Sequence, residues 1–111
     1  MSHTTKFTIS QAQSLFVDLV AELDHAYWES STIEMKDHCF NMLRLVQQEL
    51  DDLGKMSIQD HHYPYEVMNT TPNILQGALE QLFNAVNASF VQTKTKQALL
   101  ELLSQIKEGF H

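Results

Sequence analysis

The 111-residue sequence contains one cysteine, one arginine, three glycines and two prolines. A single cysteine, Cys39, cannot form an internal disulfide, so a disulfide scaffold is excluded. Because glycine and proline most often interrupt helices, their scarcity predicts long helical elements. No apolar run approaches the roughly 20 residues of a transmembrane helix. Residues 1–6 lack the basic start and apolar stretch of a signal peptide, and we therefore expect a cytoplasmic protein.

Positive charge is also scarce. Seven Lys and Arg residues face fourteen Asp and Glu residues, which gives a formal net charge of −7. Arg44 stands alone, and the closest pair of lysines, Lys94 and Lys96, is too small to follow a phosphate backbone. Nucleic acids and anionic membranes are both bound by clustered cations. We therefore expect neither a nucleic-acid partner nor a membrane partner.

The remaining composition is that of an ordinary globular protein, with 43% hydrophobic and 19% charged residues. A chain of this length buries roughly two thirds of its unfolded surface, which is enough for a core without disulfides or metal. We expect one helical-bundle domain over residues 1–111, in which residues 1–8 form a disordered tail.

Apolar residues recur at spacings of three and four, which predicts amphipathic helices. Thr8 with Gln11, and Ser31 with Glu34, have the spacing of a capping box, and Pro72 suits a first helical position. We place four helices at about 10–30, 31–53, 72–87 and 90–109. The stretch 72–109 forms either one bent helix or two, and a break near residues 87–93 favours two.

Residues 54–71 show no sustained period and are predicted to form a long irregular loop. Four helices with one apolar stripe each indicate an all-α fold, an antiparallel bundle of four amphipathic helices. The tight connection at Ser30 and Ser31 makes the first two helices a hairpin, whereas the path through the long loop leaves the topology of the other two open.

Asp60, His61 and His62 are weak candidates for metal ligands in this loop, because imidazole pairs bind zinc or nickel well. Adjacent residues rarely bind one ion without ligands from elsewhere, so we expect no metal and no other cofactor. A metal- or small-ligand-binding protein that uses the His61–His62 loop is the alternative function.

Catalytic motifs are weak throughout the sequence. Glu22 and His25 have the E-x-x-H spacing of di-iron bundles, but a helical projection directs His25 to solvent. Cys39 lies on an apolar stripe without a neighbouring cation to activate its thiol. We therefore expect no enzyme. A site built between helices from ordinary polar residues is the catalytic alternative.

The most informative residues are apolar side chains that lie away from the helical stripes. They are Val17 and Trp28 in the first helix, and Ile33 and Phe40 beside Arg44 in the second. Exposed aromatic residues interleaved with charges are typical of a protein interface. The alternative is that the third helix, the fourth helix or the segment around residues 63–68 covers them.

Asp18, Glu22 and Glu29 form an acidic face on the first helix, which is either solvated or complementary to a basic partner. Together these features predict a small acidic helical protein that is not an enzyme. We expect it to act through protein–protein contacts as an adaptor, an inhibitor, an immunity-type protein or a homodimer. Its partner is then another protein, a basic one in the sharpest version, or a second copy of itself.

Overall fold

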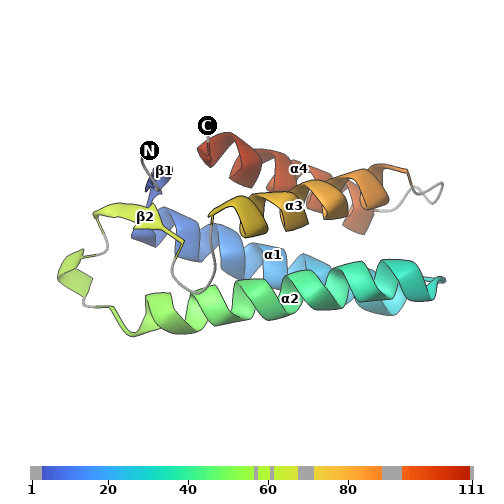
Figure 1. Cartoon of the computed structure of the whole chain (residues 1–111). Helices are drawn as coiled ribbons and strands as arrows, with labels where there is room; N and C mark the ends of the chain where they lie inside the picture. The colour runs from blue at the N-terminus through green and yellow to red at the C-terminus, as the bar shows by residue number, and fades with distance from the viewer. Residues whose placement is uncertain (1–3, 57, 61, 68–71, 89–93, 111) are drawn as a thin grey trace.

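The computed structural model describes residues 4–56, 58–60, 62–67, 72–88 and 94–110. Four helices dominate it, and two short strands pair with each other (Figure 1). In chain order the elements are β1 (Thr4–Thr8), α1 (Ile9–Glu29), α2 (Ile33–Gly54), a 3-10 turn (Ile58–Asp60), β2 (Pro64–Glu66), α3 (Pro72–Asn87) and α4 (Lys94–Gly109). The all-α prediction is confirmed, and so are two separate helices in the last third of the chain.

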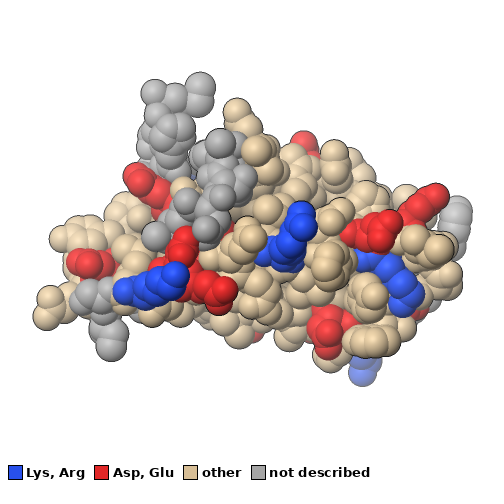
Figure 2. Space-filling model, turned by 60° about the horizontal axis from the view of Figure 1, so that its bottom comes forward, with Lys and Arg blue, Asp and Glu red and all other residues tan. Residues whose placement is uncertain are grey.

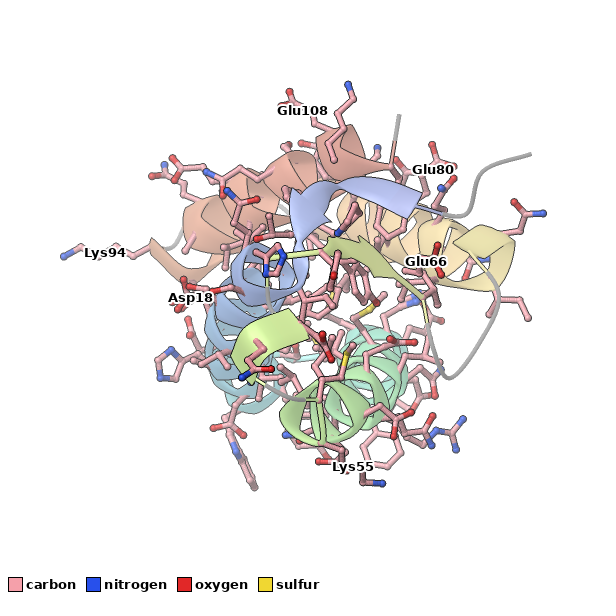
Figure 3. All side chains as sticks on the ribbon, turned by 90° about the vertical axis from the view of Figure 1, so that its left-hand side faces the viewer. Asp18, Lys55, Glu66, Glu80, Lys94 and Glu108 are labelled. Atoms are coloured by element: carbon pink, nitrogen blue, oxygen red, sulfur yellow. The ribbon has the colours of Figure 1, made fainter. Side chains whose placement is uncertain are left out.

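Each helix runs antiparallel to its neighbours, and the four helices form a closed square when viewed from the end (Figure 3). Helix α1 packs against α2 and α4, and α3 packs against the same two helices from the opposite corner. The resulting bundle measures 42 × 26 × 21 Å. Its core consists of the inward stripes of all four helices, together with Tyr65 of β2, because each stripe is too wide to be covered by one neighbouring helix alone.

Side-chain caps fix where the first two helices begin. The Gln11 amide donates to Thr8 Oγ1 at 3.1 Å, and the Thr8 amide donates to Gln11 Oε1 at 3.0 Å. This is the predicted capping box, which satisfies amides that have no partner within the helix. Helix α2 is capped by Thr32, whose hydroxyl accepts from the Met35 amide at 3.2 Å, rather than by Ser31.

The expectation of a disordered tail at residues 1–8 is wrong for Thr4–Thr8, which form strand β1. This strand pairs antiparallel with β2, with Thr4 opposite Glu66 and Thr8 opposite Pro64. The Ile9 amide continues the pairing by donating to the Tyr63 carbonyl at 2.9 Å. The two strands lie over the end of the bundle where α1 begins and α2 ends (Figure 1).

The segment 54–71 is therefore not uniformly irregular. Helix α2 includes Gly54, and the 3-10 turn and β2 add regular structure before α3. Tyr65 at the centre of β2 is fully buried, which anchors the crossing segment to the core. No local period predicts such an element, because its backbone bonds come from a strand some sixty positions earlier in the chain.

Candidate interaction surface

The five residues predicted to form an interface lie on the outer side of the α1–α2 hairpin, and we call this set the hairpin face. It comprises Val17, Trp28, Ile33, Phe40 and Arg44. The exposed fractions of the four apolar side chains are 54%, 74%, 78% and 56% in that order, and Arg44 is also exposed. The described parts of the chain leave these residues uncovered, contrary to the alternative that α3, α4 or β2 buries them.

Helical spacing joins these residues into two parallel stripes. In α2 the spacing of Ile33, Phe40 and Arg44 is seven and four residues, which keeps all three on one side of the helix. In α1, Trp28 follows Val17 by eleven positions, which is about three turns of the helix. Lys36 of α2 lies over the rings of both Tyr27 and Trp28 at the end of α1, and so joins the two stripes. The stripes are therefore neighbours across that contact and form one continuous face.

Trp28 is exposed but held in place at the hairpin turn. Its ring meets the Tyr27 ring edge-to-face, with centroids 5.3 Å apart and an interplanar angle of 86°. The Lys36 ammonium lies 4.5 Å from the Tyr27 centroid and 5.8 Å from the Trp28 centroid. Lys36 Nζ also donates to the Tyr27 carbonyl at 2.7 Å, in the last turn of α1. These contacts hold the exposed Trp28 ring in one position at the end of α1.

The predicted acidic face is divided between two environments. Asp18 and Glu22 line an open groove of about 260 Å³ between α1 and α4, which Glu101 also lines. The small side chains of Ala21 and Ala98 form part of its lining and leave room there. Three carboxylates therefore surround this groove, and none of its lining residues carries a positive charge.

Glu29 belongs to a different contact, because its Oε2 accepts a hydrogen bond from Thr95 Oγ1 at 2.6 Å. This bond ties the end of α1 to the start of α4. His25 is exposed, as the helical projection predicts, and its Nδ1 lies 3.9 Å from Glu22 Oε2. Two acidic side chains of α1, Glu22 and Glu29, thus have polar neighbours within the bundle.

The loop candidates for metal binding are only partly placed. His61 lies outside the described residues. Asp60 is half-buried at the end of the 3-10 turn, and the exposed His62 ring stacks at a tilt on Tyr63 with centroids 4.4 Å apart. Within the described ranges, no three His, Cys, Asp or Glu side chains are grouped to hold a metal ion.

Cys39 lies on the inner stripe of α2 and is fully buried. The expectation that no cation lies near the thiol is wrong, because Lys36 is close enough to act on it. Burial nevertheless raises the pKa of the Cys39 thiol, and this effect outweighs the opposing effects of Lys36 and the Ser30 hydroxyl. A thiol with a raised pKa is a poor nucleophile near neutral pH. This residue therefore packs like a small apolar side chain.

One buried polar pair was missed by the sequence reasoning. Glu49 in α2 and Tyr65 in β2 are both fully buried, and the Tyr65 hydroxyl donates to Glu49 Oε2 at 2.8 Å. The Tyr65 ring also packs edge-to-face on Phe16, with centroids 5.5 Å apart. Glu49 was detectable, since it lies three residues after Val46 and four before Leu53 on the apolar stripe. Tyr65 gave no comparable signal.

Burial raises the pKa of the Tyr65 hydroxyl far above its ordinary value, and the neighbouring Glu49 carboxylate raises it further by charge and by hydrogen bonding. The phenol therefore stays protonated and keeps donating its hydrogen bond. This arrangement links β2 to α2 across the core, and its chemistry is that of a structural contact.

Charged side chains do not gather on the side of the molecule where α2 comes forward. Figure 2 shows acidic and basic side chains scattered there, with surface of other residues between them. None of the helices in the described part of the chain is long and apolar enough to cross a membrane. No protein-family model, no curated protein and no solved structure matches this chain.

Proposed function

We propose that this protein is a non-enzymatic interaction protein that binds another protein chain through the hairpin face. The observation that carries this proposal is the exposure of Trp28, Ile33, Phe40 and Val17 on one side of one helical hairpin. Four large apolar side chains on a single face exceed the scattered exposure that is normal for a monomer. Arg44 adds the residue type that, with tryptophan, is most enriched at the energetic centres of interfaces.

The proposed location is the cytoplasm, where a single buried thiol such as Cys39 stays reduced. The scattered cations support a protein partner over a nucleic acid or a membrane surface. In this proposal the protein acts by binding its partner, as an adaptor or an inhibitor does.

The test measures the size of the assembly that contains the full chain. It uses two samples, the purified protein and an extract of its host. We expect a species heavier than the 12.8 kDa monomer in at least one of these samples. A Trp28→Ser variant should lose this species, because removing a buried interface tryptophan typically costs 2 kcal/mol or more, about thirtyfold in Kd.

Ile74→Ser is the matched control, because Ile74 on α3 is 57% exposed but lies outside the hairpin face. It should keep the assembly intact. A chain that migrates as a monomer in both samples, or an assembly that Trp28→Ser leaves unchanged, would overturn the proposal.

A further inference from the structure

Two side chains of opposite charge flank Phe40 on the outer side of α2. Asp37 lies three residues before Phe40 and Arg44 lies four residues after it, on the same side of the helix. Both charged side chains are exposed, and neither has an ion-pair partner among the described residues. They are about 10 Å apart along the helix axis, which is too far for them to pair with each other.

We propose that the partner of the hairpin face is a second copy of this chain, packed face to face about a two-fold axis that passes near Phe40. This inference rests on the proposed function and names its partner. The axis reverses the helix direction, so α2 of each copy lies antiparallel to α2 of the other. Asp37 of each copy then meets Arg44 of the other, and the two Phe40 rings meet at the centre.

The α1 part of the face obeys the same symmetry. Lys36 Nζ contacts the Tyr27 carbonyl, which places these two residues at about the same height in the hairpin. The midpoint between Val17 and Trp28 lies about four and a half residues before Tyr27 in α1, and the midpoint between Asp37 and Arg44 lies about as many residues after Lys36 in α2. Because the two helices are antiparallel, the two midpoints lie at the same height. A single axis therefore serves both helices, and it brings Trp28 of each copy over Val17 of the other.

The size of the overlap suits a dimer of moderate affinity. Helices α1 and α2 contain 21 and 22 residues, and the proposed axis lies about seven residues from the turn end of each. Only about fourteen residues of each helix therefore face the other copy, which is roughly 21 by 20 Å at a rise of 1.5 Å per residue and a helix spacing of about 10 Å. This projected area of about 400 Å² is about half of the roughly 800 Å² of accessible surface that each partner contributes to a standard interface.

The charges on the face favour a second copy over a basic protein. A uniformly basic surface would oppose Arg44 with like charge, whereas a second copy offers Asp37 in the matching position. Net charges of −7 on both copies repel, but ions screen charges that are farther apart than about 8 Å at physiological salt. The contacts within the face are shorter than this length and are therefore screened less.

Exchanging the charges of Asp37 and Arg44 tests whether these two residues pair between copies. The measurement is sedimentation equilibrium of the purified full chain over a series of concentrations. The wild-type protein should reach twice the mass of 12.8 kDa. Asp37→Arg and Arg44→Asp should each weaken the dimer at least about tenfold, because each variant replaces two attractive contacts with two repulsive ones. The double variant Asp37→Arg/Arg44→Asp should restore the affinity to near that of the wild type.

Glu108→Arg is the matched control for the change of charge, because Glu108 lies on α4, on the opposite side of the bundle from Lys55 at the end of α2 (Figure 3). It should leave the dimer unchanged. A second measurement uses Phe40→Cys, in which a cysteine near the axis meets its own copy. Oxidation with diamide should yield a disulfide-linked dimer of this variant, whereas the wild-type protein with its buried Cys39 should stay uncrosslinked.

A monomer at every concentration, or a dimer in which the double variant is no better than the single ones and Phe40→Cys does not crosslink, would overturn the second copy as partner. The proposed function survives this result if the Trp28-dependent assembly appears in the host extract with a different chain. The absence of any such assembly would overturn both proposals, so the two failures are distinguishable.

Discussion

Tyr65 and Trp28 show how position determines what an aromatic side chain does in this protein. Tyr65 is fully buried and uses its hydroxyl to satisfy a buried carboxylate, that of Glu49. Trp28 is mostly exposed and uses its ring contacts with Tyr27 and Lys36 to stay ordered at the surface. Tyr65 holds β2 to the core, and Trp28 belongs to the surface that we propose binds a partner.

The hydrogen bond from Tyr65 to Glu49 should contribute measurably to stability. A Tyr65→Phe substitution keeps the ring but removes a donor from a buried carboxylate oxygen. It should lower the free energy of unfolding by about 1–3 kcal/mol, measured by urea denaturation. Tyr63→Phe is the matched control, because Tyr63 is exposed, and it should change stability little. Equal stability of the two variants would contradict the buried bond.

The same pair predicts a dependence on alkaline pH. The pKa of Tyr65 is raised in the folded state, so the unfolded chain loses this proton first, near the ordinary tyrosine pKa of about 10. Below that pH the contribution of Tyr65 is complete, and above it stability should fall by up to about 1.4 kcal/mol per pH unit. The Tyr65→Phe variant should lack this part of the alkaline decline, which urea denaturation at several pH values measures.

At the scale of the element, β1 depends on helix α4 as well as on β2. A Cβ atom added at Gly109, at the end of α4, would collide with the Phe7 ring of β1. Glycine therefore stands at this position because the ring and the helix backbone approach closely. This contact and the pairing with β2 hold Thr4–Thr8 at the end of the bundle, where a disordered tail was predicted.

A pair of glycine substitutions tests this contact. Gly109→Ala should lower the free energy of unfolding by about 1–3 kcal/mol, because Phe7 must move away from its place on α4. Gly77→Ala, in the middle of α3 with open space around it, should instead raise this free energy by about 1 kcal/mol. Chemical denaturation of the two variants and the wild-type protein measures both changes. A stabilising effect of both substitutions would show that Phe7 does not pack on Gly109.

The helices were predictable because each carries its own pattern. A repeat of three and four residues, the Thr8 cap and the Pro72 start all lie within a few positions of the structure they specify. The strand pair was not, since β1 and β2 find their hydrogen-bond partners far away in the chain and are too short for a period.

The candidate site shows the same division. The five residues of the hairpin face were identified by their position off the helical stripes, and the structure leaves all five exposed. Glu49 was visible as a charge on an apolar stripe, but its partner Tyr65 comes from a loop without periodicity. Local patterns thus identify which faces are unusual, whereas pairings across the core require the fold itself.

For the molecule as a whole, the hairpin face and the net charge act in opposite directions. Exposed apolar area favours association, and a dimer would carry twice the charge of −7. In the proposed dimer, the pairing of Asp37 with Arg44 would supply local attraction where the two chains come closest. The affinity of the proposed dimer therefore depends on short-range contacts over a face of limited area, and we expect it to be moderate.

Such an affinity should make thermal stability depend on protein concentration, because dissociation accompanies unfolding. For a dimer of this size, the unfolding midpoint should rise by about 3 °C for each tenfold increase in concentration, measured by scanning calorimetry. Phe40→Asp places a charge beside the proposed two-fold axis and should abolish this dependence, whereas Glu108→Arg should preserve it. A midpoint of the wild-type chain that stays constant over the concentration series would contradict dimerisation. The hairpin face would then bind a different protein or none.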